Sequence, residues 1–490
     1  MRIDSVLVRV DRDGPGSLQR QIATGLREAI ASGLVAARTR LPGTRTLAAQ
    51  LGVSRTTAAL AIDALIAEGY VVARPRSGCF VADDPPRAAR PLRTRQAATP
   101  RATVRPSRAA RARARDAAAS PPDRRSRTAF PLSRPALDAF PIETWSRLLS
   151  RRAARTSIAQ LDYGGGLPVL ARAIATLVSA SRGVRIEPAQ VLIVGGGQRA
   201  IEVAAAAILD PGDRVVVEDP GYPGAREAFL AAGAELLPVR VDRDGLDVAA
   251  LPRRARLAYV TPACQFPLAV PLSLARRTAL LRWATRAGAV IVEDDYDAEF
   301  RFAGAPLPSL AALDRDGRVL QAGSFSRTLF PAIRLGYLIV PPALVEAVRA
   351  VRDARDPDMP SLPQLALADF IEAGHYVHHL RRMRVLYRAR RDVLIAAARA
   401  AGLTVRLGEV GLHIVCDLPP GCDARTVSST AAAAGITAAP LAAFQLRGRA
   451  PQAIVLGFGS VPPARIRSAM ALLAEVALPP PLLRGRPLPG

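Results

Sequence analysis

The sequence predicts an α/β protein in which a small helical domain precedes a large domain built on a mostly parallel sheet. From Asp162 onward, helical patterns alternate with short apolar runs, among them residues 191–194, 214–217, 257–260 and 289–292. This alternation is typical of parallel strands covered by helices. In residues 1–82, by contrast, three helical patterns are followed by two short strand-like runs. At 490 residues, the chain is long enough for both domains.

Three helices are predicted near the N-terminus. The first covers residues 17–31, where apolar residues recur at every fourth position. Thr44 is expected to cap a second, short helix that ends before Gly52. Ser54 is expected to cap a third helix over residues 55–68, which buries one apolar side and leaves its N-terminal turn exposed.

A basic hairpin is predicted after the third helix. Residues 70–73 and 79–82 form its strands, and residues 74–78 form its turn. Three helices and a basic hairpin compose a winged helix-turn-helix, whose third helix enters a major groove while the hairpin reaches the flanking backbone. A small helical interaction domain is the alternative.

The same stretch closely resembles the GntR-type winged-helix family. The matching segments are residues 18–22, 26–30, 40–42, 47–57 and 65–70. The resemblance implies double-stranded DNA as a partner and favours a DNA-binding domain over an interaction domain. It also implies the contact residues, which are Arg40, Arg45, Arg55, Thr56, Thr57, Arg74 and Gly78. Arg suits this work because it is always charged and bonds phosphates and guanine edges bidentately.

The positive charge of the chain comes from Arg alone. The sequence contains no Lys and no Asn, so all 67 basic residues are Arg, and the formal net charge is +25. Residues 83–127 are the most basic, with 13 Arg, four acidic residues and hardly any large apolar side chain. Such a stretch cannot offset its ordering entropy by burial, so a disordered linker is predicted between domains at residues 1–82 and 128–490. The linker is either a non-specific contact to DNA phosphates or a solvated tether.

Several classes of protein are excluded. The first residues do not form a signal peptide, and no run of 18 apolar residues occurs, so neither secretion nor a membrane partner is expected and the predicted location is cytoplasmic. The four Cys residues are scattered without CxxC pairs, so neither a disulfide framework nor a metal site is predicted.

Functional residues of the large domain gather after its predicted strands. Residues 195–198 offer glycine N–H groups at the start of a helix, which suits an anion. Residues 218–226, 293–301 and 323–334 follow three other strands and add aromatic, carboxylate and Arg side chains. Since such folds place their sites at strand ends, these segments are expected to meet.

This combination resembles the pyridoxal-phosphate site of fold type I aminotransferases, and together with the winged helix it is similar to the MocR/GabR family of transcriptional regulators. The resemblance covers nearly the whole chain. It implies that Tyr222 stacks on the cofactor ring, Asp294 pairs with the ring nitrogen and Tyr296 faces the phenolic oxygen. The implied phosphate ligands are Gly197, Gln198, Ser324 and Arg334.

The sequence departs from that family at the catalytic position. In the motif at residues 324–327, Arg327 stands where the family has the Schiff-base lysine. A guanidinium remains protonated and is no amine nucleophile, so no catalytic residue is assigned and Arg327 is expected in the cofactor pocket, where it needs an anion. The family's Arg for a substrate carboxylate is also not evident, and Arg447 or Arg449 is a substitute.

These observations predict a homodimeric DNA-binding transcriptional regulator with an aminotransferase-like effector domain that lacks catalysis. Its ligand is pyridoxal 5'-phosphate held non-covalently, an adduct of that cofactor with an amino-acid-like effector, or nothing. The alternatives are a pyridoxal-phosphate-dependent aminotransferase with a DNA-binding appendix, and a regulator whose large domain is only a dimerisation scaffold.

Overall fold

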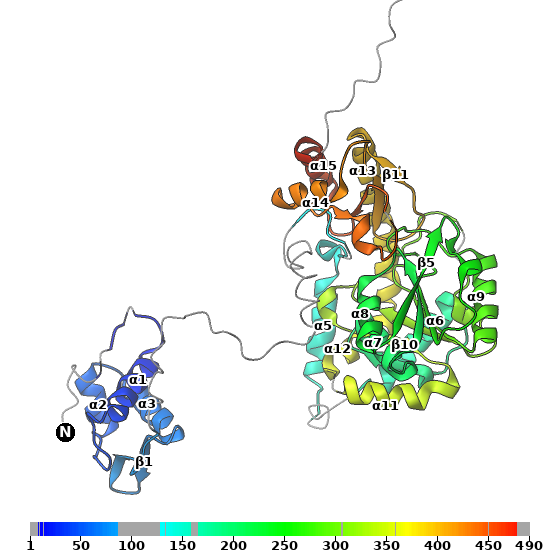
Figure 1. Cartoon of the computed structure of the whole chain (residues 1–490). Helices are drawn as coiled ribbons and strands as arrows, with labels where there is room; N and C mark the ends of the chain where they lie inside the picture. Colours follow the sequence, from blue (N-terminus) through cyan, green and yellow to red (C-terminus); the bar gives the residue numbers. More distant parts are fainter. Residues whose placement is uncertain are drawn as a thin grey trace, which may run out of the picture. The chain divides into compact units, whose positions relative to one another are not determined.

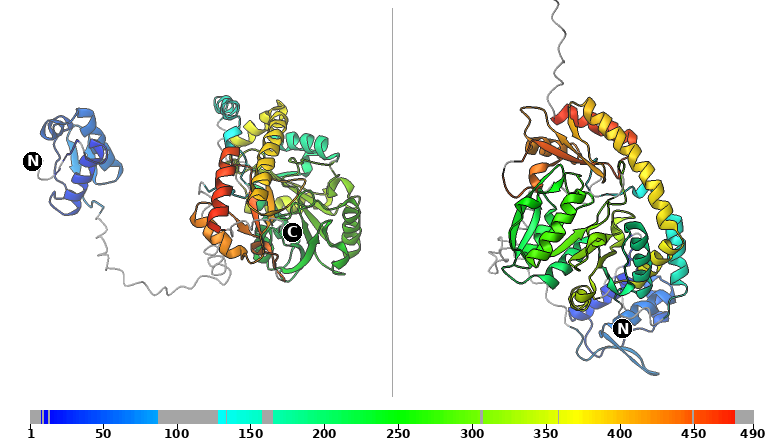
Figure 2. Two further views of the ribbon diagram at one scale, coloured as in Figure 1. Left: turned by 90° about the horizontal axis from the view of Figure 1, so that it is seen from above. Right: turned by 90° about the vertical axis from the view of Figure 1, so that its right-hand side faces the viewer.

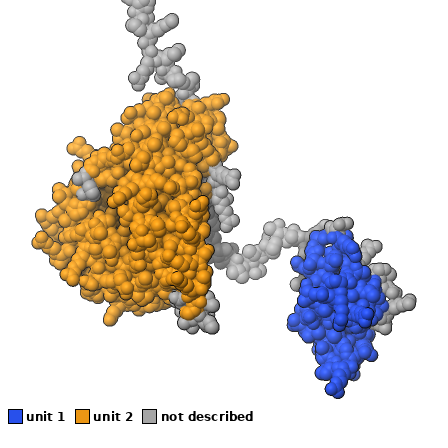
Figure 3. All heavy atoms as spheres, turned by 180° about the vertical axis from the view of Figure 1, so that it is seen from behind, with its two compact units in different colours: residues 1–106 blue, residues 107–490 orange. Residues whose placement is uncertain are grey.

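The computed structural model of the chain describes residues 8, 10–12, 14–86, 128–132, 134–157, 165–304, 307–357, 359–448 and 450–477. It contains two compact units, residues 1–106 and residues 107–490 (Figures 1 and 3). Nearly all of the predicted linker therefore lies outside the described residues, as do the C-terminal 13 residues.

Unit 1 contains the three predicted helices. They are α1 (Leu18–Ala31), α2 (Thr44–Leu51) and α3 (Arg55–Ala67). The hydroxyl of Ser17 accepts from the Arg20 N–H at the start of α1, and that of Ser54 accepts from the Thr57 N–H at the start of α3. Ser54 thus caps α3 as predicted.

The hairpin of unit 1 consists of β1 (Val71–Arg74) and β2 (Gly78–Val81), an antiparallel pair in which Val71 lies opposite Val81. Its strands are shifted by one residue from those predicted. The apolar sides of the helices and the base of this hairpin share one core, which includes Ile22, Leu26 and Leu65. That core fixes the hairpin beside α3.

Unit 2 is built on an eight-stranded, mostly parallel sheet, as predicted. The strand order is β3-β10-β9-β8-β7-β4-β5-β6. The strands are β3 (Val191–Val194), β4 (Arg214–Asp219), β5 (Glu235–Asp242), β6 (Gly245–Leu246), β7 (Leu257–Val260), β8 (Val290–Asp294), β9 (Val319–Ser324) and β10 (Gly336–Ile339). Strand β10 runs antiparallel to both of its neighbours, and β6 is antiparallel to β5.

Helices cover both faces of this sheet. They are α5 (Ile142–Ala153), α6 (Pro168–Arg182), α7 (Gly197–Ile208), α8 (Pro223–Ala231), α9 (Leu274–Ala287), α10 (Leu310–Leu313), α11 (Val345–Arg355) and α12 (Ser361–Glu372). Val215 and Val217 pack on the face that bears α7 and α8, whereas Val216 packs on the face that bears α9. Because both faces are buried, the central strands are continuous apolar runs rather than alternating ones.

A second, smaller sheet lies at one end of unit 2 (Figure 1). Its order is β11-β12-β14-β13, with strands β11 (Thr404–Arg406), β12 (His413–Asp417), β13 (Ala439–Pro440) and β14 (Ala453–Gly457). Helices α14 (Ala424–Ala433) and α15 (Pro463–Ala477) accompany it. The 26-residue helix α13 (His375–Ala400) connects α12 with this sheet and packs against α15.

Two local expectations differ from the structure. Thr44 is the first residue of α2 and not its cap, because Gly43 holds the N-cap position without a side-chain bond. The sequence analysis also missed β10 and the second sheet, whose strands have only two to five residues. In the described part of the chain, no helix has the length and apolarity needed to cross a membrane.

Candidate functional site

The predicted pocket residues lie at one edge of the large sheet. Strands β3, β4, β7, β8 and β9 all run in the same direction, because β3 and β9 are both antiparallel to β10. Their carboxyl ends lead into Gly195, Pro220, Thr261, Asp295 and Phe325. Open α/β sheets place their ligand sites at this edge.

Asp294 ends β8 and accepts a hydrogen bond of 2.6 Å from the Tyr259 hydroxyl. Burial raises the pKa of Asp294 to about 6, although the bond from Tyr259 opposes this shift. The carboxylate is therefore mostly ionised at neutral pH and suited to a cationic partner. The sequence analysis did not identify Tyr259 as a site residue. Tyr259 lies within β7, which pairs with β8, and not in one of the segments that follow the predicted strands.

Tyr222 and Gln198, which were predicted for different parts of the cofactor, contact each other. The Tyr222 hydroxyl donates to Gln198 Oε1 at 3.2 Å, and Gln198 Nε2 donates to the Gly224 carbonyl at 2.9 Å. A β-carbon at Gly224 would lie 2.7 Å from the Tyr222 hydroxyl oxygen, so only glycine permits this approach. The Tyr222 ring also packs edge-on against Phe266, which contacts Tyr296 in the same manner.

Gly197 and Ser324 also lie side by side. A β-carbon added at Gly197 would lie 3.4 Å from that of Ser324. Gly197 begins α7 and follows Gly196, whose φ of +105° favours glycine. The N-terminus of α7 therefore opens toward Ser324 without a side chain between them, which suits an anion. The Gly195 N–H is already used, since it donates to Asp356 at 2.6 Å.

Arg327 is engaged by a carboxylate of its own chain. Its Nε donates to Asp297 Oδ1 at 2.6 Å, and its Nη2 bonds the other oxygen. The Asp297 side chain is fully buried and also accepts from the Leu412 N–H at 3.2 Å. Although burial disfavours the charged form, Asp297 holds the pKa of Arg327 above its usual range. The anion that the sequence analysis expected from a ligand is here Asp297.

Tyr296 lies between Arg327 and Cys264. The Arg327 guanidinium lies 5.2 Å from the centre of the Tyr296 ring, and the Tyr296 hydroxyl lies 3.7 Å from Cys264 Sγ. Burial raises the pKa of Cys264 to about 12, so this thiol is not a thiolate. A cavity of about 60 Å³ adjoins the group and is lined in part by Ser324 and Arg327.

Arg334 lies close to the end of β9, because the Phe325 N–H donates to the Leu335 carbonyl and Gly336 pairs with Ser324. It is exposed, has a φ of +51°, and its side chain bonds none of the described residues. Arg447 is exposed as well; its backbone N–H donates to Asp219 at 2.9 Å, and its carbonyl accepts from Gln445 Nε2 at 2.5 Å. Arg449 lies outside the described residues.

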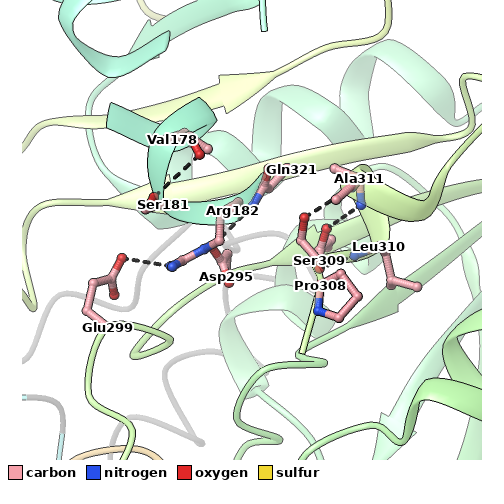
Figure 4. Close-up of polar contacts among 12 residues, drawn as sticks. Val178, Ser181, Arg182, Asp295, Glu299, Pro308, Ser309, Leu310, Ala311 and Gln321 are labelled. Carbon is pink, nitrogen blue, oxygen red and sulfur yellow. Dashed lines mark hydrogen bonds and ion pairs between the residues drawn. The ribbon is translucent and has the colours of Figure 1, made fainter. Parts of the chain in front are cut away.

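Further buried charges lie beside the pocket (Figure 4). Arg182 donates to Asp295 at 2.7 Å and to Glu299 at 3.0 Å. Gln321 donates to the same Asp295 oxygen at 3.1 Å. One guanidinium thus faces two carboxylates, and burial raises the pKa of Glu299 although Arg182 opposes this shift. Among the described residues, no group of His, Cys, Asp and Glu side chains is suited to a metal ion.

Most of the predicted DNA-contact residues of unit 1 are exposed. Arg55 and Thr56 are exposed on the first turn of α3, whereas the Thr57 hydroxyl is half-buried and contacts Ser54 at 2.7 Å. At the hairpin, the Arg40 guanidinium lies 3.5 Å from where a Gly78 β-carbon would be. Arg45 and Arg74 are exposed, and Arg74 lies over the Phe80 ring at 4.8 Å.

Unit 1 has the geometry of a winged helix-turn-helix, and unit 2 has that of an aminotransferase, which together define a two-domain regulator. Residues 18–81 match the family of bacterial regulatory proteins of the gntR type, and residues 132–464 match the class I and II aminotransferases. Unit 2 also resembles a multiple substrate aminotransferase from Thermococcus profundus, with 26% identity and a TM-score of 0.67 over 76% of this chain and 95% of that one.

Relatives match the chain over nearly its whole length. The chain is 39% identical to a probable rhizopine catabolism regulatory protein, MocR, of Rhizobium meliloti, over 96% of this chain and 95% of the relative. It is 36% identical to the HTH-type transcriptional regulator TauR of Rhodobacter capsulatus, over 94% and 97%. The chain belongs to this family of HTH-type transcriptional regulators with an aminotransferase domain. The predicted DNA-binding regulator is thereby confirmed, and a simple aminotransferase is not favoured.

Proposed function

We propose that the aminotransferase-like unit of this regulator holds pyridoxal 5'-phosphate, or an adduct of it with an amino-acid-like effector, without a covalent bond and without turnover. The observation that carries this proposal is Arg327, which follows the motif Ser324-Phe-Ser where the family has its lysine. The chain contains no Lys at all, so no other side chain supplies the amine.

The geometry at the end of β9 supports a phosphate site. Gly197 begins α7 beside Ser324 and has no side chain of its own, and free N–H groups at a helix N-terminus suit an anion. We assign the phosphate to Gly197, Gln198, Ser324 and Arg334. Arg334 is the cation of this set, and because it is exposed and without a carboxylate among the described residues, its charge is available.

The cofactor ring is assigned to Asp294, Tyr222 and Tyr296. Asp294 would pair with the ring nitrogen, since a pKa of about 6 leaves it mostly ionised at neutral pH. Tyr222 would cover one face of the ring, and the Tyr296 hydroxyl would donate to the phenolic oxygen. When bound, the cofactor supplies an aldehyde that condenses with amines and a ring that withdraws electrons. Arg327, neutralised by Asp297, attacks no aldehyde and moves no proton.

The test is a titration of the purified chain with pyridoxal phosphate, followed by absorbance and by melting temperature. We expect saturable stabilisation that dialysis reverses, because a ligand that binds only the native state raises its stability. Borohydride should leave no cofactor attached to any side chain. Activity towards an amino acid and a keto acid, dependent on added cofactor, would contradict the proposal.

Variant R327K sharpens this test. It places an amine at the predicted position, so borohydride should then attach one pyridoxyl phosphate group to the peptide that carries residue 327. The matched control is R282K, which introduces an equally unique lysine on the exposed side of α9. Equal labelling of both variants would show that no site directs the cofactor. If pyridoxal phosphate neither stabilises the chain nor labels R327K, unit 2 has no cofactor site and is only a dimerisation scaffold.

We also propose that unit 2 forms a homodimer that presents two winged helices to a two-part operator. A symmetric dimer bound to duplex DNA reads two half-sites at a fixed spacing. Gel retardation with fragments of the DNA upstream of its own gene, together with light scattering of the free chain, tests this arrangement. A monomer in solution, or no retarded fragment, would contradict it.

A further inference from the structure

Helix α13 carries a strongly basic exposed surface. Its first 17 residues, from His375 to Arg391, include six Arg residues and no acidic residue, and the first acidic side chain is Asp392. Four of these Arg residues, at positions 381, 382, 384 and 388, are exposed, and Arg382 Nη2 donates to the Ala139 carbonyl. We refer to Arg381, Arg384 and Arg388 as the α13 stripe. Figure 2 shows α13 as a long yellow-to-orange helix along the margin of unit 2.

The spacing of the α13 stripe places its members on one side of the helix. Residues three and four positions apart are neighbours on a helix surface, so the stripe is a continuous row. At 1.5 Å per residue, the row from Arg381 to Arg388 is about 10 Å long. Since each DNA strand has one phosphate per 3.4 Å of helix axis, this length corresponds to about three phosphates.

The positive charge of the stripe is not neutralised by the chain. Arg384 Nε donates to the Glu299 carbonyl at 2.7 Å, and Arg388 Nη2 donates to the Phe302 carbonyl at 2.9 Å. Each bond fixes one end of the guanidinium against neutral backbone and leaves other N–H groups exposed. Within the described part of the chain, no carboxylate forms an ion pair with any of the three.

Neighbouring Arg residues on the same helix behave differently. Arg390 is buried and pairs with Asp138 at 2.7 Å, while Arg391 lies 3.6 Å from Asp392. Unlike Arg390 and Arg391, the residues of the α13 stripe have no carboxylate partner among the described residues, so their charge is available to an external anion. Fixed guanidinium forks without a counter-ion match the oxygens of phosphate groups.

We propose that the α13 stripe is a second DNA contact, which binds backbone phosphates of the duplex held by unit 1. DNA fits better than other polyanions because the same chain carries a DNA-binding unit. A duplex bound by the winged helix is thereby present at high local concentration for unit 2. Phosphate contacts carry no sequence information, so the stripe would add affinity and salt dependence without changing base preference.

The test compares full-length variants R381Q/R388Q and R282Q/R286Q. Both remove two exposed Arg residues from a helix of unit 2, the second pair from α9, and both keep good helix formers. Binding to a 60-bp duplex from the upstream region is measured by fluorescence anisotropy between 50 and 200 mM salt. Melting temperatures establish that each variant is folded.

Loss of two phosphate contacts should reduce the slope of log K against log salt by about 2 in R381Q/R388Q. The R282Q/R286Q slope should remain that of the unaltered chain. Equal slopes in the unaltered chain and R381Q/R388Q would overturn the proposal, as would an equal decrease in both variants, which would reflect net charge alone. If the unaltered chain binds no duplex, the proposed binding of unit 1 to an operator is contradicted instead. Failure of that proposal is therefore distinguishable from failure of the α13 stripe proposal.

Discussion

The Arg residues of the two predicted sites have opposite surroundings. On unit 1, Arg45 and Arg55 are exposed at the surface predicted to face DNA. In unit 2, Arg327 is held by Asp297, and Arg182 is held by Asp295 and Glu299. A buried guanidinium is tolerated only with a counter-ion, whereas an exposed one remains available to an external phosphate. An Arg residue in a motif therefore indicates a binding site only when no carboxylate of the same chain neutralises its charge.

The largest expected effect concerns Asp297. Replacing it in D297A leaves the Arg327 charge buried without its partner, which should cost about 3–5 kcal/mol of unfolding free energy. Urea unfolding measures this loss. The control D392A removes an exposed partner on α13 and should cost less than about 1 kcal/mol. Equal losses in the two variants would show that the Arg327 pair is no different from a surface pair.

Variant R55Q should weaken binding to duplex DNA by roughly 10- to 100-fold, since a good Arg contact contributes about 1–3 kcal/mol. Its melting temperature should not change, because Arg55 is exposed and bonds no core residue. Anisotropy with an upstream fragment measures the binding. The control is R20Q, an exposed position on α1. If R20Q weakens binding as much, the α3 turn is not the DNA surface.

The independence of the units is tested at two helix caps. Variant S54A removes the 3.0 Å bond from the Thr57 N–H at α3 and should destabilise unit 1 by about 1 kcal/mol. Variant S273A removes the equivalent cap of α9 and should lower only the stability of unit 2. Calorimetry should resolve two transitions, each sensitive to one variant. A single transition that shifts in both would show coupling between the units.

The smallest effect concerns pH. Burial raises the pKa of Glu218 to about 7, although Thr261 and Gln265 donate to it. The folded protein therefore retains a proton that the unfolded chain loses, so this contribution is full below the unfolded pKa and disappears as the pH rises through 7. Between pH 6 and pH 8 the loss should be on the order of 1 kcal/mol. Urea unfolding of E218Q should show a correspondingly flatter profile, and an unchanged profile would contradict the assignment.

Local patterns predicted much of the fold. Strands β3 and β7 have the predicted bounds, and Ser54 caps α3, because apolar runs and caps depend on adjacent residues. Strand β10 was missed because it lies between β3 and β9. Its pairing with β3 joins residues that are more than 100 positions apart in the sequence. Tyr259 and Asp297 were missed because each acts on a side chain from another element.

Ala269 illustrates a backbone conformation that only the structure shows. It has a φ of +57°, in the left-handed region that favours glycine. This conformation has a cost in backbone strain, and Ala269 lies next to Cys264 and Val410 in a small buried cluster. Only the φ angle distinguishes this position from an ordinary loop alanine.

The sequence by itself determined the two-domain order, the winged-helix elements and the absence of any lysine amine, because these follow from composition and from residues near one another in the chain. Only the tertiary structure decided where each charge is used. In that structure Asp297 forms an ion pair with Arg327, whereas the α13 stripe has no carboxylate partner among the described residues. Burial and ion pairing depend on which distant segments of the chain meet.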